Sequence, residues 1–222
     1  MPQLSENAIE MLYRVPVLLL SFMVHELSHA YVALWNGDDT AKNAGRLTLN
    51  PLKHIDPIGA LLLIFARFGW AKPVPINPNN FRKPKPGIIA TSLAGPLSNV
   101  LLAFLFSIPY IFLTLKYGYR GMERFSAPAI AINLFFEFMI VNVSLAAFNL
   151  IPIPPLDGSK VLFAILPDRI YYNYVLRFER YGMIVLIALS FSGVLGRLMD
   201  PLFNGLFWLI SKAVLPIASL FA

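Results

Sequence analysis

The stretch LLLSFMVHELSHAYVALW (residues 18–35) determines how the rest of the chain is interpreted. Its apolar run approaches the length of about 20 residues that a helix needs to cross a bilayer. Yet His25, Glu26 and His29 lie inside it. Ionisable side chains are costly in hydrocarbon, and where they are found they usually serve a function. The stretch therefore predicts a membrane helix that carries a functional site.

Composition supports a membrane protein. The chain has 222 residues, of which 57% are hydrophobic and 14% are charged, whereas ordinary soluble domains are about 25% charged. No polar block separates one part from another, so we expect a single domain over residues 1–222. Cysteine is absent, which excludes disulfides and thiolate metal ligands. The net charge of +6 fits basic membrane loops, and no nucleic-acid partner is expected.

Apolar segments predict an all-α polytopic membrane protein with about five to six transmembrane helices. Three segments are long enough to span, and two further candidates follow a proline-rich run and a short apolar piece near residue 160. In chain order the five segments cover about residues 8–35, 87–115, 128–150, 181–195 and 201–221.

The region between the first two segments predicts an insert that dips into the membrane. Residues 45–50 alternate polar and apolar, which is typical of a short strand. Residues 57–70 are apolar but too short to span, and residues 72–87 hold too many prolines for a helix. Together these features predict a short re-entrant β-hairpin-like insert, tolerated at depth only where protein or water satisfies its backbone.

Basic residues predict the orientation. They concentrate in the loops 36–86 and 153–180. The positive-inside rule then places these loops in the cytoplasm and the N-terminus outside. The opposite side is expected to hold only Lys116, Arg120, Arg124 and Arg197, with Arg14 near the start of the first helix.

Residues 25–29 read HELSH, the pattern HExxH. On a helix, positions four apart lie one turn above the other, so the imidazoles of His25 and His29 can reach one metal ion. Glu26 flanks them and is placed to accept a proton from water activated by that ion. The alternative is a pair of buried core histidines with Glu26 as a polar packing residue. Their place inside a membrane helix favours the metal site.

A catalytic zinc site needs a third protein ligand and leaves one position for water. Asp157 directly follows the third apolar segment, so the chain returns there to the membrane side and depth of His29. Because Asp-Gly is also a turn signal, a plain turn aspartate is the alternative. We expect Asp157 to be the third ligand. The other candidates were His54, Asp56, Glu137 and Asp168.

HELSHA, GRLTLNPLKHIDPIG, GWAKPVPIN, AGPLSN and NLIPIPPLDG occur in this order along the chain. In combination these motifs resemble the site-2 protease family of intramembrane zinc metalloproteases, in a compact form without a PDZ or cystathionine-synthase-type domain. The resemblance implies a three-helix catalytic core over about residues 8–167, with additional membrane helices over about 172–222. It implies one zinc ion per chain held by His25, His29 and Asp157, with Glu26 as catalytic acid and base.

The resemblance also marks a substrate-contacting region. It implies substrate contacts for Asn149, Pro152 and Pro154, although Asn149 alternatively satisfies backbone groups that the following prolines free. His54, in KHIDP, is a further candidate. It is expected to act as a transient ligand, as a partner that orients water, or as an interfacial anchor.

These features predict an intramembrane zinc metalloendopeptidase that cleaves peptide bonds in or near transmembrane segments of membrane-protein substrates. A metal transporter and a catalytically inactive membrane scaffold are the alternatives. The expected partners are the lipid bilayer and those substrates, with a second copy of the chain or a regulatory membrane protein left open. The expected location is a prokaryotic cytoplasmic membrane, with the active site toward the cytoplasmic side.

Overall fold

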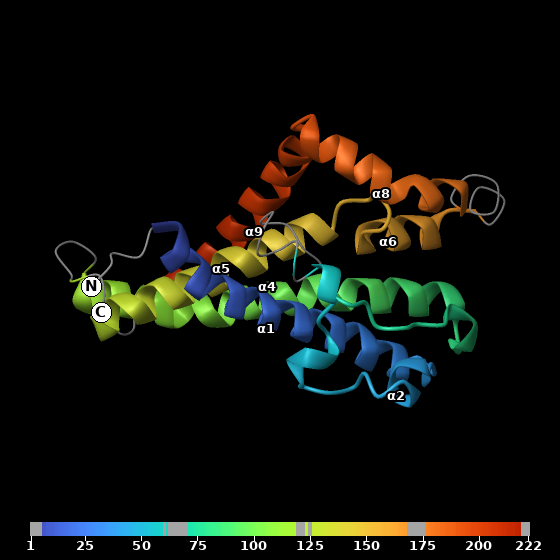
Figure 1. Cartoon of the computed structure of the whole chain (residues 1–222), viewed down its shortest axis with the longest axis horizontal. Coiled ribbons are helices and arrows are strands. Elements are labelled where there is room, and N and C mark those ends of the chain that lie inside the picture. Colours follow the sequence, from blue (N-terminus) through green and yellow to red (C-terminus); the bar gives the residue numbers. More distant parts are fainter. Residues whose placement is uncertain are drawn as a thin grey trace.

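Helices make up every regular element in the described part of the chain (Figure 1). The structure is a computed structural model and describes residues 6–59, 61, 71–118, 123, 126–167 and 176–218. In chain order the elements are α1 (Glu6–Trp35), α2 (Thr40–Asn43), the 3-10 helices η1 (Pro51–Lys53) and η2 (Pro78–Asn80), α4 (Pro84–Tyr117), α5 (Ala127–Asn149), α6 (Asp157–Ile165), α8 (Leu176–Phe191) and α9 (Val194–Ala218).

Four of the described helices are long and apolar enough to cross a membrane. They comprise Met11–Trp35 of α1, all of α4 and α5, and Val194–Ile217 of α9. The chain is therefore an all-α polytopic membrane protein, as predicted. The expected number of about five to six spans exceeds these four, because the apolar part of α8, Arg180–Phe191, is shorter than a spanning helix.

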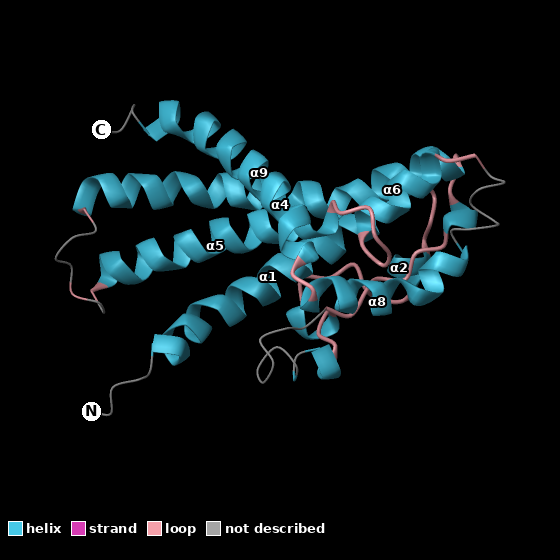
Figure 2. Cartoon of the chain, turned by 90° about the horizontal axis from the view of Figure 1, so that it is seen from above, coloured by secondary structure: helices cyan, strands magenta, loops and turns pink. Residues whose placement is uncertain are grey.

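Helices α1, α4 and α5 run side by side and form the predicted three-helix core (Figures 1 and 2). In the half that holds the first turns of α1, Val17 packs against Phe138 and Val141 of α5. The rings of Phe106 on α4 and Phe138 stack with centroids 4.1 Å apart. Apolar packing therefore defines this half of the core.

The start of α9 lies beside the loop that follows α5. There Leu195 and Met199 contact Ile151 and Leu156, and further along α9 packs against α4 and α5. Arg197 therefore lies at the same end of the core as that loop, so its expected place on the opposite side is wrong. Within the described residues, the apolar part of α8 is shorter than a spanning helix, so it does not carry the chain across before α9 begins.

The insert between α1 and α4 shows no strand among its described residues, so the strand expected over 45–50 is wrong. Its backbone is satisfied by side chains instead. His54 Nε2 donates to the Thr48 carbonyl at 2.9 Å, and Asn50 Oδ1 accepts from the Leu52 N–H at 3.0 Å. Such local bonds compete with strand pairing.

A β-hairpin is likewise not seen in the described part of the insert. One isolated antiparallel bridge joins Ile55 and Ala71. Of the apolar segment 57–70, which is expected to be too short to span, residues 60 and 62–70 lie outside the described residues.

Candidate metal centre

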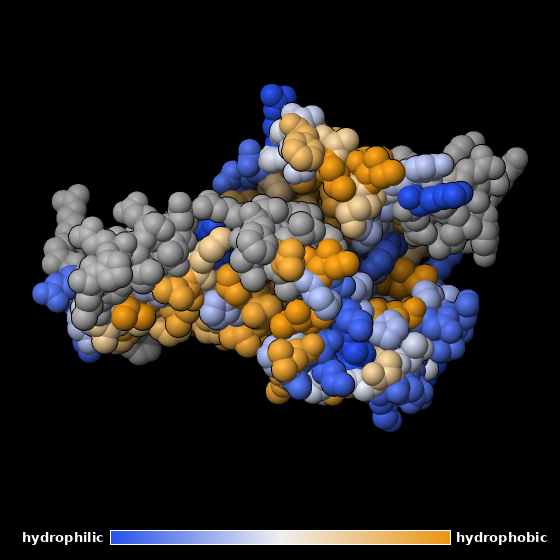
Figure 3. Space-filling view, in the orientation of Figure 1, coloured by the Kyte–Doolittle hydropathy of each residue, from blue (hydrophilic) through white to orange (hydrophobic). Residues whose placement is uncertain are grey.

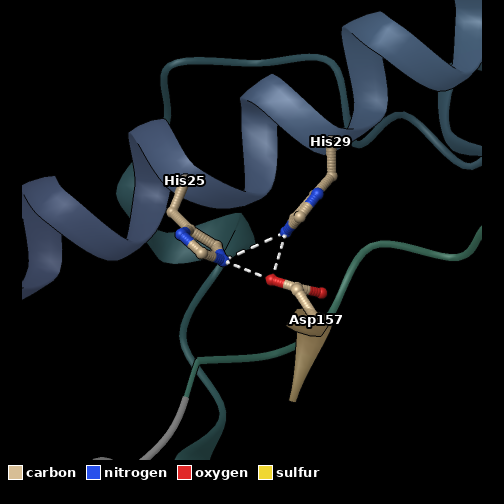
Figure 4. A group of neighbouring side chains, drawn as sticks. All are labelled: His25, His29 and Asp157. Carbon is tan, nitrogen blue, oxygen red and sulfur yellow. Dashed lines mark hydrogen bonds and ion pairs between the residues drawn. The ribbon is translucent and has the colours of Figure 1, made fainter. Parts of the chain in front are cut away.

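Two imidazoles leave the same face of α1, one turn apart. His25 and His29 are both buried, and their Nε2 atoms lie 3.0 Å from each other. The rings meet edge to face with centroids 4.6 Å apart (Figure 4). The HExxH spacing thus places both ring nitrogens at one point, as a helix requires.

Asp157, the first residue of α6, points at the two imidazoles (Figure 4). Its Oδ2 lies 3.2 Å from His25 Nε2 and 3.1 Å from His29 Nε2. Within the described residues, these three form the one group of histidine and acidic side chains close enough to hold a metal ion. Residues 132 positions apart in the sequence therefore converge at one buried point.

The loop after α5 fixes the position of Asp157. Ile151 and Leu156 are buried against Leu186 of α8. A Cβ on Gly158 would lie 2.3 Å from the Leu150 carbonyl oxygen, so only glycine lets α6 begin this close to the end of α5. The Asp-Gly pair thus starts a helix rather than closing a turn.

The remaining nitrogen of each imidazole has its own acceptor. His25 Nδ1 lies 2.6 Å from Asn99 Oδ1, and His29 Nδ1 lies 2.6 Å from the Thr91 carbonyl oxygen. A carbonyl oxygen can only accept, so both Nδ1 atoms carry the proton in the neutral rings. Both Nε2 atoms then present lone pairs, and this is the arrangement typical of metal-binding histidines.

The chemistry of these donors fits zinc. Two Nε2 lone pairs and Asp157 Oδ2 face one another, and Oδ2 has no hydrogen-bond donor among the described residues. Zinc ligands at about 2.0–2.2 Å in a tetrahedron stand roughly 3.3 Å apart, close to the 3.0–3.2 Å seen between these atoms. A single cation at their centre would satisfy all three, which a single proton could not.

Helix α4 supplies the space in front of the two histidines. A Cβ added to Gly95 would lie 2.4 Å from His29 Nε2 and 2.5 Å from His25 Nε2. Any side chain there would collide with the candidate ligand atoms. At Gly95, within the AGPLSN motif, the α4 backbone therefore packs directly against the candidate metal centre.

Glu26 adjoins this centre without joining the group of three. Its Oε2 accepts the backbone N–H of Val74 at 2.8 Å. Pro73 and Pro75 flank Val74 and have no N–H, so Val74 carries the one main-chain donor of this tripeptide. The side chain of Arg46 donates to the Lys72 carbonyl at 2.6 Å and to the Pro73 carbonyl at 3.1 Å. Arg46 thereby holds the segment that orients Glu26.

A second anchor ties the same segment to the end of α1. The buried carboxylate of Asp38 accepts from the Asn77 N–H at 2.7 Å, from Asn80 Nδ2 at 2.8 Å, and from the N–H and hydroxyl of Thr40. Burial alone would raise the pKa of Asp38, but these hydrogen bonds outweigh it and lower the pKa below its ordinary value. The charged carboxylate is thus the form that holds the segment.

The four residues predicted to contact substrate do not belong to the group of three. Asn149 donates to the Leu145 carbonyl at 3.0 Å, at the end of α5. Pro152 is exposed, whereas Pro154 is buried against Gly182 of α8. His54 is buried in the insert. Substrate contact at these positions stays a prediction.

Sequence reasoning missed the partners that orient this centre. In the sequence, Asn99 stands out only as part of the AGPLSN motif, and Arg46 only as part of the basic loop and of the strand expected over residues 45–50. The signal for Asn99 was available, because an amide inside an apolar membrane helix needs a hydrogen-bond partner. Nothing in the sequence pointed to the backbone of Thr91 or Val74, since every residue type except proline offers the same main-chain groups.

Comparisons with known proteins agree on one family. The model of Peptidase family M50 matches residues 118–193. "Putative zinc metalloprotease YwhC" of Bacillus subtilis (strain 168) is 43% identical over 193 residues, which cover 86% of this chain and 86% of the relative. "Putative zinc metalloprotease Rip2" of Mycolicibacterium smegmatis is 30% identical over 190 residues, 81% of this chain and 66% of the relative.

A more distant relative has the same kind of name. "Zinc metalloprotease MJ0392" of Methanocaldococcus jannaschii is 26% identical over 160 residues, 72% of this chain and 35% of the relative. No solved structure gave a significant match.

Proposed function

Because this chain belongs to peptidase family M50, the site-2 protease family of membrane zinc metalloproteases, we propose that it cleaves peptide bonds in or near transmembrane segments of other membrane proteins. The observation that carries this proposal is that two buried imidazole nitrogens face a carboxylate oxygen that has no hydrogen-bond partner among the described residues. It lies on a membrane-spanning helix. Residues 1–222 act as a single domain in this proposal.

His25, His29 and Asp157 hold the zinc ion. When bound, zinc lowers the pKa of water from near 16 toward about 7 and polarises a carbonyl oxygen. Glu26 accepts the proton of the attacking water and passes it to the leaving amine. Before Glu26 takes up that proton, the hydrogen bond from the Val74 N–H keeps its carboxylate beside the histidines.

The depth of the candidate site within α1 explains how it can reach a substrate inside the membrane. His25 precedes the end of α1 at Trp35 by ten residues, or about 15 Å at 1.5 Å per residue. A substrate helix hides its peptide bonds in hydrogen bonds and must unwind before hydrolysis. The irregular insert, with its backbone held by side chains, lies at the end of the core where such an unwound segment would enter.

The distribution of polar and basic residues supports an orientation in which the end of the core beside the metal centre faces the cytoplasm. Figure 3 shows hydrophilic residues gathered over α2 and the neighbouring loops, and hydrophobic ones along the core helices. With Arg197 now at the same end, the excess of basic residues beside the metal centre is larger than the sequence suggested. By the positive-inside rule, that end faces the cytoplasm of a prokaryotic cell and the start of α1 faces outward.

The test uses Glu26→Gln, which keeps an oxygen to accept the Val74 N–H but cannot take up a proton. We expect the purified full chain to retain about one zinc ion and to lose cleavage of membrane proteins. Cleavage sites are mapped by comparing membrane-protein fragments in cells that carry the parent chain or the variant. Fragments that end in transmembrane segments are expected only with the parent.

Glu137→Gln is the matched control. Glu137 lies on α5 and pairs with Arg14 at 3.3 Å, in the half of the core away from the metal centre. This variant should cleave like the parent. Full cleavage by Glu26→Gln would refute the assigned role of Glu26, and fragments ending only in water-soluble domains would refute intramembrane cleavage. Bound zinc without any cleavage by the parent chain would favour a transporter or an inactive scaffold.

A further inference from the structure

Hydrogen bonding behind the metal centre extends through three helices. Asn99 of α4, whose Oδ1 accepts from His25, donates through Nδ2 to Asn142 Oδ1 of α5 at 2.8 Å. Asn142 Nδ2 in turn donates to Ser21 Oγ at 2.9 Å and to the Phe138 carbonyl at 2.8 Å. Ser21 lies one turn before His25, so the hydrogen-bond chain returns to α1.

Burial makes each of these bonds necessary. Ser21, Asn99 and Asn142 are each 0% exposed, inside helices that span the membrane. Water and lipid offer no replacement partner at such a position, and an unpaired buried amide is costly. Each amide must therefore present its oxygen and its nitrogen to the correct neighbour.

One backbone group sets the direction of the whole chain. The Phe138 carbonyl can only accept, so the atom of Asn142 that faces it is Nδ2. Asn142 Oδ1 then faces Asn99 and can only accept from Asn99 Nδ2. Asn99 must consequently turn its Oδ1 toward His25, which leaves the proton on His25 Nδ1.

We propose that Asn142 is a positioning residue for the zinc site, although it contacts Asn99 and not a candidate ligand itself. Acting through Asn99, it holds His25 in the tautomer whose Nε2 is free to bind zinc. The proposal rests on the ligand role proposed above for His25. If Asn142 were absent, the Asn99 amide could rotate and present its NH₂ to His25 Nδ1. The proton would then move to Nε2, the nitrogen that zinc needs.

Zinc affinity tests this directly. The full chain is purified in detergent, and its zinc dissociation constant is measured by competition with a chelator of known affinity. Asn142→Leu should weaken zinc binding roughly tenfold, since partners of metal-binding histidines typically contribute 10–100-fold to metal affinity. Asn99→Leu should weaken it at least as much.

A double-mutant cycle separates positioning from general destabilisation. If Asn142 acts through Asn99, the double variant binds zinc no more weakly than Asn99→Leu alone. If the losses of zinc affinity in the two single variants instead multiply in the double variant, the proposal is overturned. Ser144→Ala is the matched control, because the Ser144 hydroxyl bonds only the Ile140 carbonyl among the described residues. It should leave zinc affinity unchanged.

Nitrogen NMR of labelled histidines gives a readout that does not depend on zinc or on proteolysis. In the metal-free parent, His25 Nδ1 should carry a proton, and in Asn142→Leu a form of His25 without a proton on Nδ1 should appear. His29 is the internal reference, because the Thr91 carbonyl fixes its tautomer independently. An unchanged His25 spectrum in the variant would refute the proposal, whereas failure of the parent to bind zinc would instead refute the proposed function.

Asn142→Thr keeps the proposal testable if the leucine variant does not fold. A threonine hydroxyl can accept from Asn99 and donate to the Phe138 carbonyl, which preserves the direction of the chain. It should therefore recover most of the parent zinc affinity. If the Asn142→Thr variant folds normally but binds zinc tenfold more weakly than the parent, the proposed role of Asn142 is contradicted.

Discussion

The two halves of the three-helix core are held together by different forces. Around Val17, Phe106 and Phe138, apolar side chains and stacked rings fill the contacts between helices. Around His25 and Asn99, buried polar side chains are joined by specific hydrogen bonds between the helices. Apolar packing tolerates exchange of similar volumes, whereas a polar group in a membrane helix cannot find a substitute partner. Function is therefore concentrated in the half where substitution is least tolerated.

The largest effect is expected from Gly95→Ala. The added Cβ would lie 2.4–2.5 Å from both candidate ligand nitrogens, with the α4 backbone behind it. We expect loss of stoichiometric zinc and of all proteolysis, with helical content retained. Metal analysis and circular dichroism of the purified chain check this. Gly205→Ala on α9 is the control, because a Cβ there meets no atom of a described residue within 4 Å.

An intermediate effect is expected from Arg46→Leu. Without its guanidinium, the Lys72 and Pro73 carbonyls lose their donor, and the Val74 N–H is no longer held against Glu26. The turnover number should fall by about tenfold or more, part of the roughly 10²–10⁴-fold that a positioned general base contributes, while zinc stays bound. Lys42→Leu, an exposed change in the same region, should not alter turnover. Lost zinc in Arg46→Leu would show that the segment supports the metal instead.

The smallest functional effect is expected in the apolar half, from Phe138→Ala. It removes the ring stacked on Phe106 at 4.1 Å but leaves the Phe138 carbonyl in place. The loss of stability should fall below the 3–5 kcal/mol typical of water-soluble cores, because lipid tails are as apolar as the lost ring. Thermal unfolding should shift downward by several degrees, with zinc affinity unchanged. Weakened zinc binding would contradict the division between the two halves.

Sequence alone predicted the parts of this protein that depend on periodicity and on rare residues. HExxH in a membrane helix pointed to a metal, and counting membrane crossings selected Asp157, which the structure brings to within 3.2 Å of both imidazoles. Both inferences rest on helix geometry, which is the same in every helix.

The predictions that failed depended on features that the pattern of residue types does not specify. Alternation over residues 45–50 suggested a strand, but His54 and Asn50 satisfy backbone groups locally, so no ladder is needed. Arg197 was placed on the wrong side because α8 was counted as a crossing. The role of Asn99 requires knowing that α4 faces His25, which no pattern within a single segment can reveal.

The hydrogen bond between Val74 and Glu26 has a consequence for how this protein can evolve. Its donor belongs to the main chain, so almost any residue could replace valine at position 74 without removing it. Only a third consecutive proline would do so. The proposed general base, Glu26, is thus held by a contact that survives sequence drift, and comparison of related sequences would not reveal its importance.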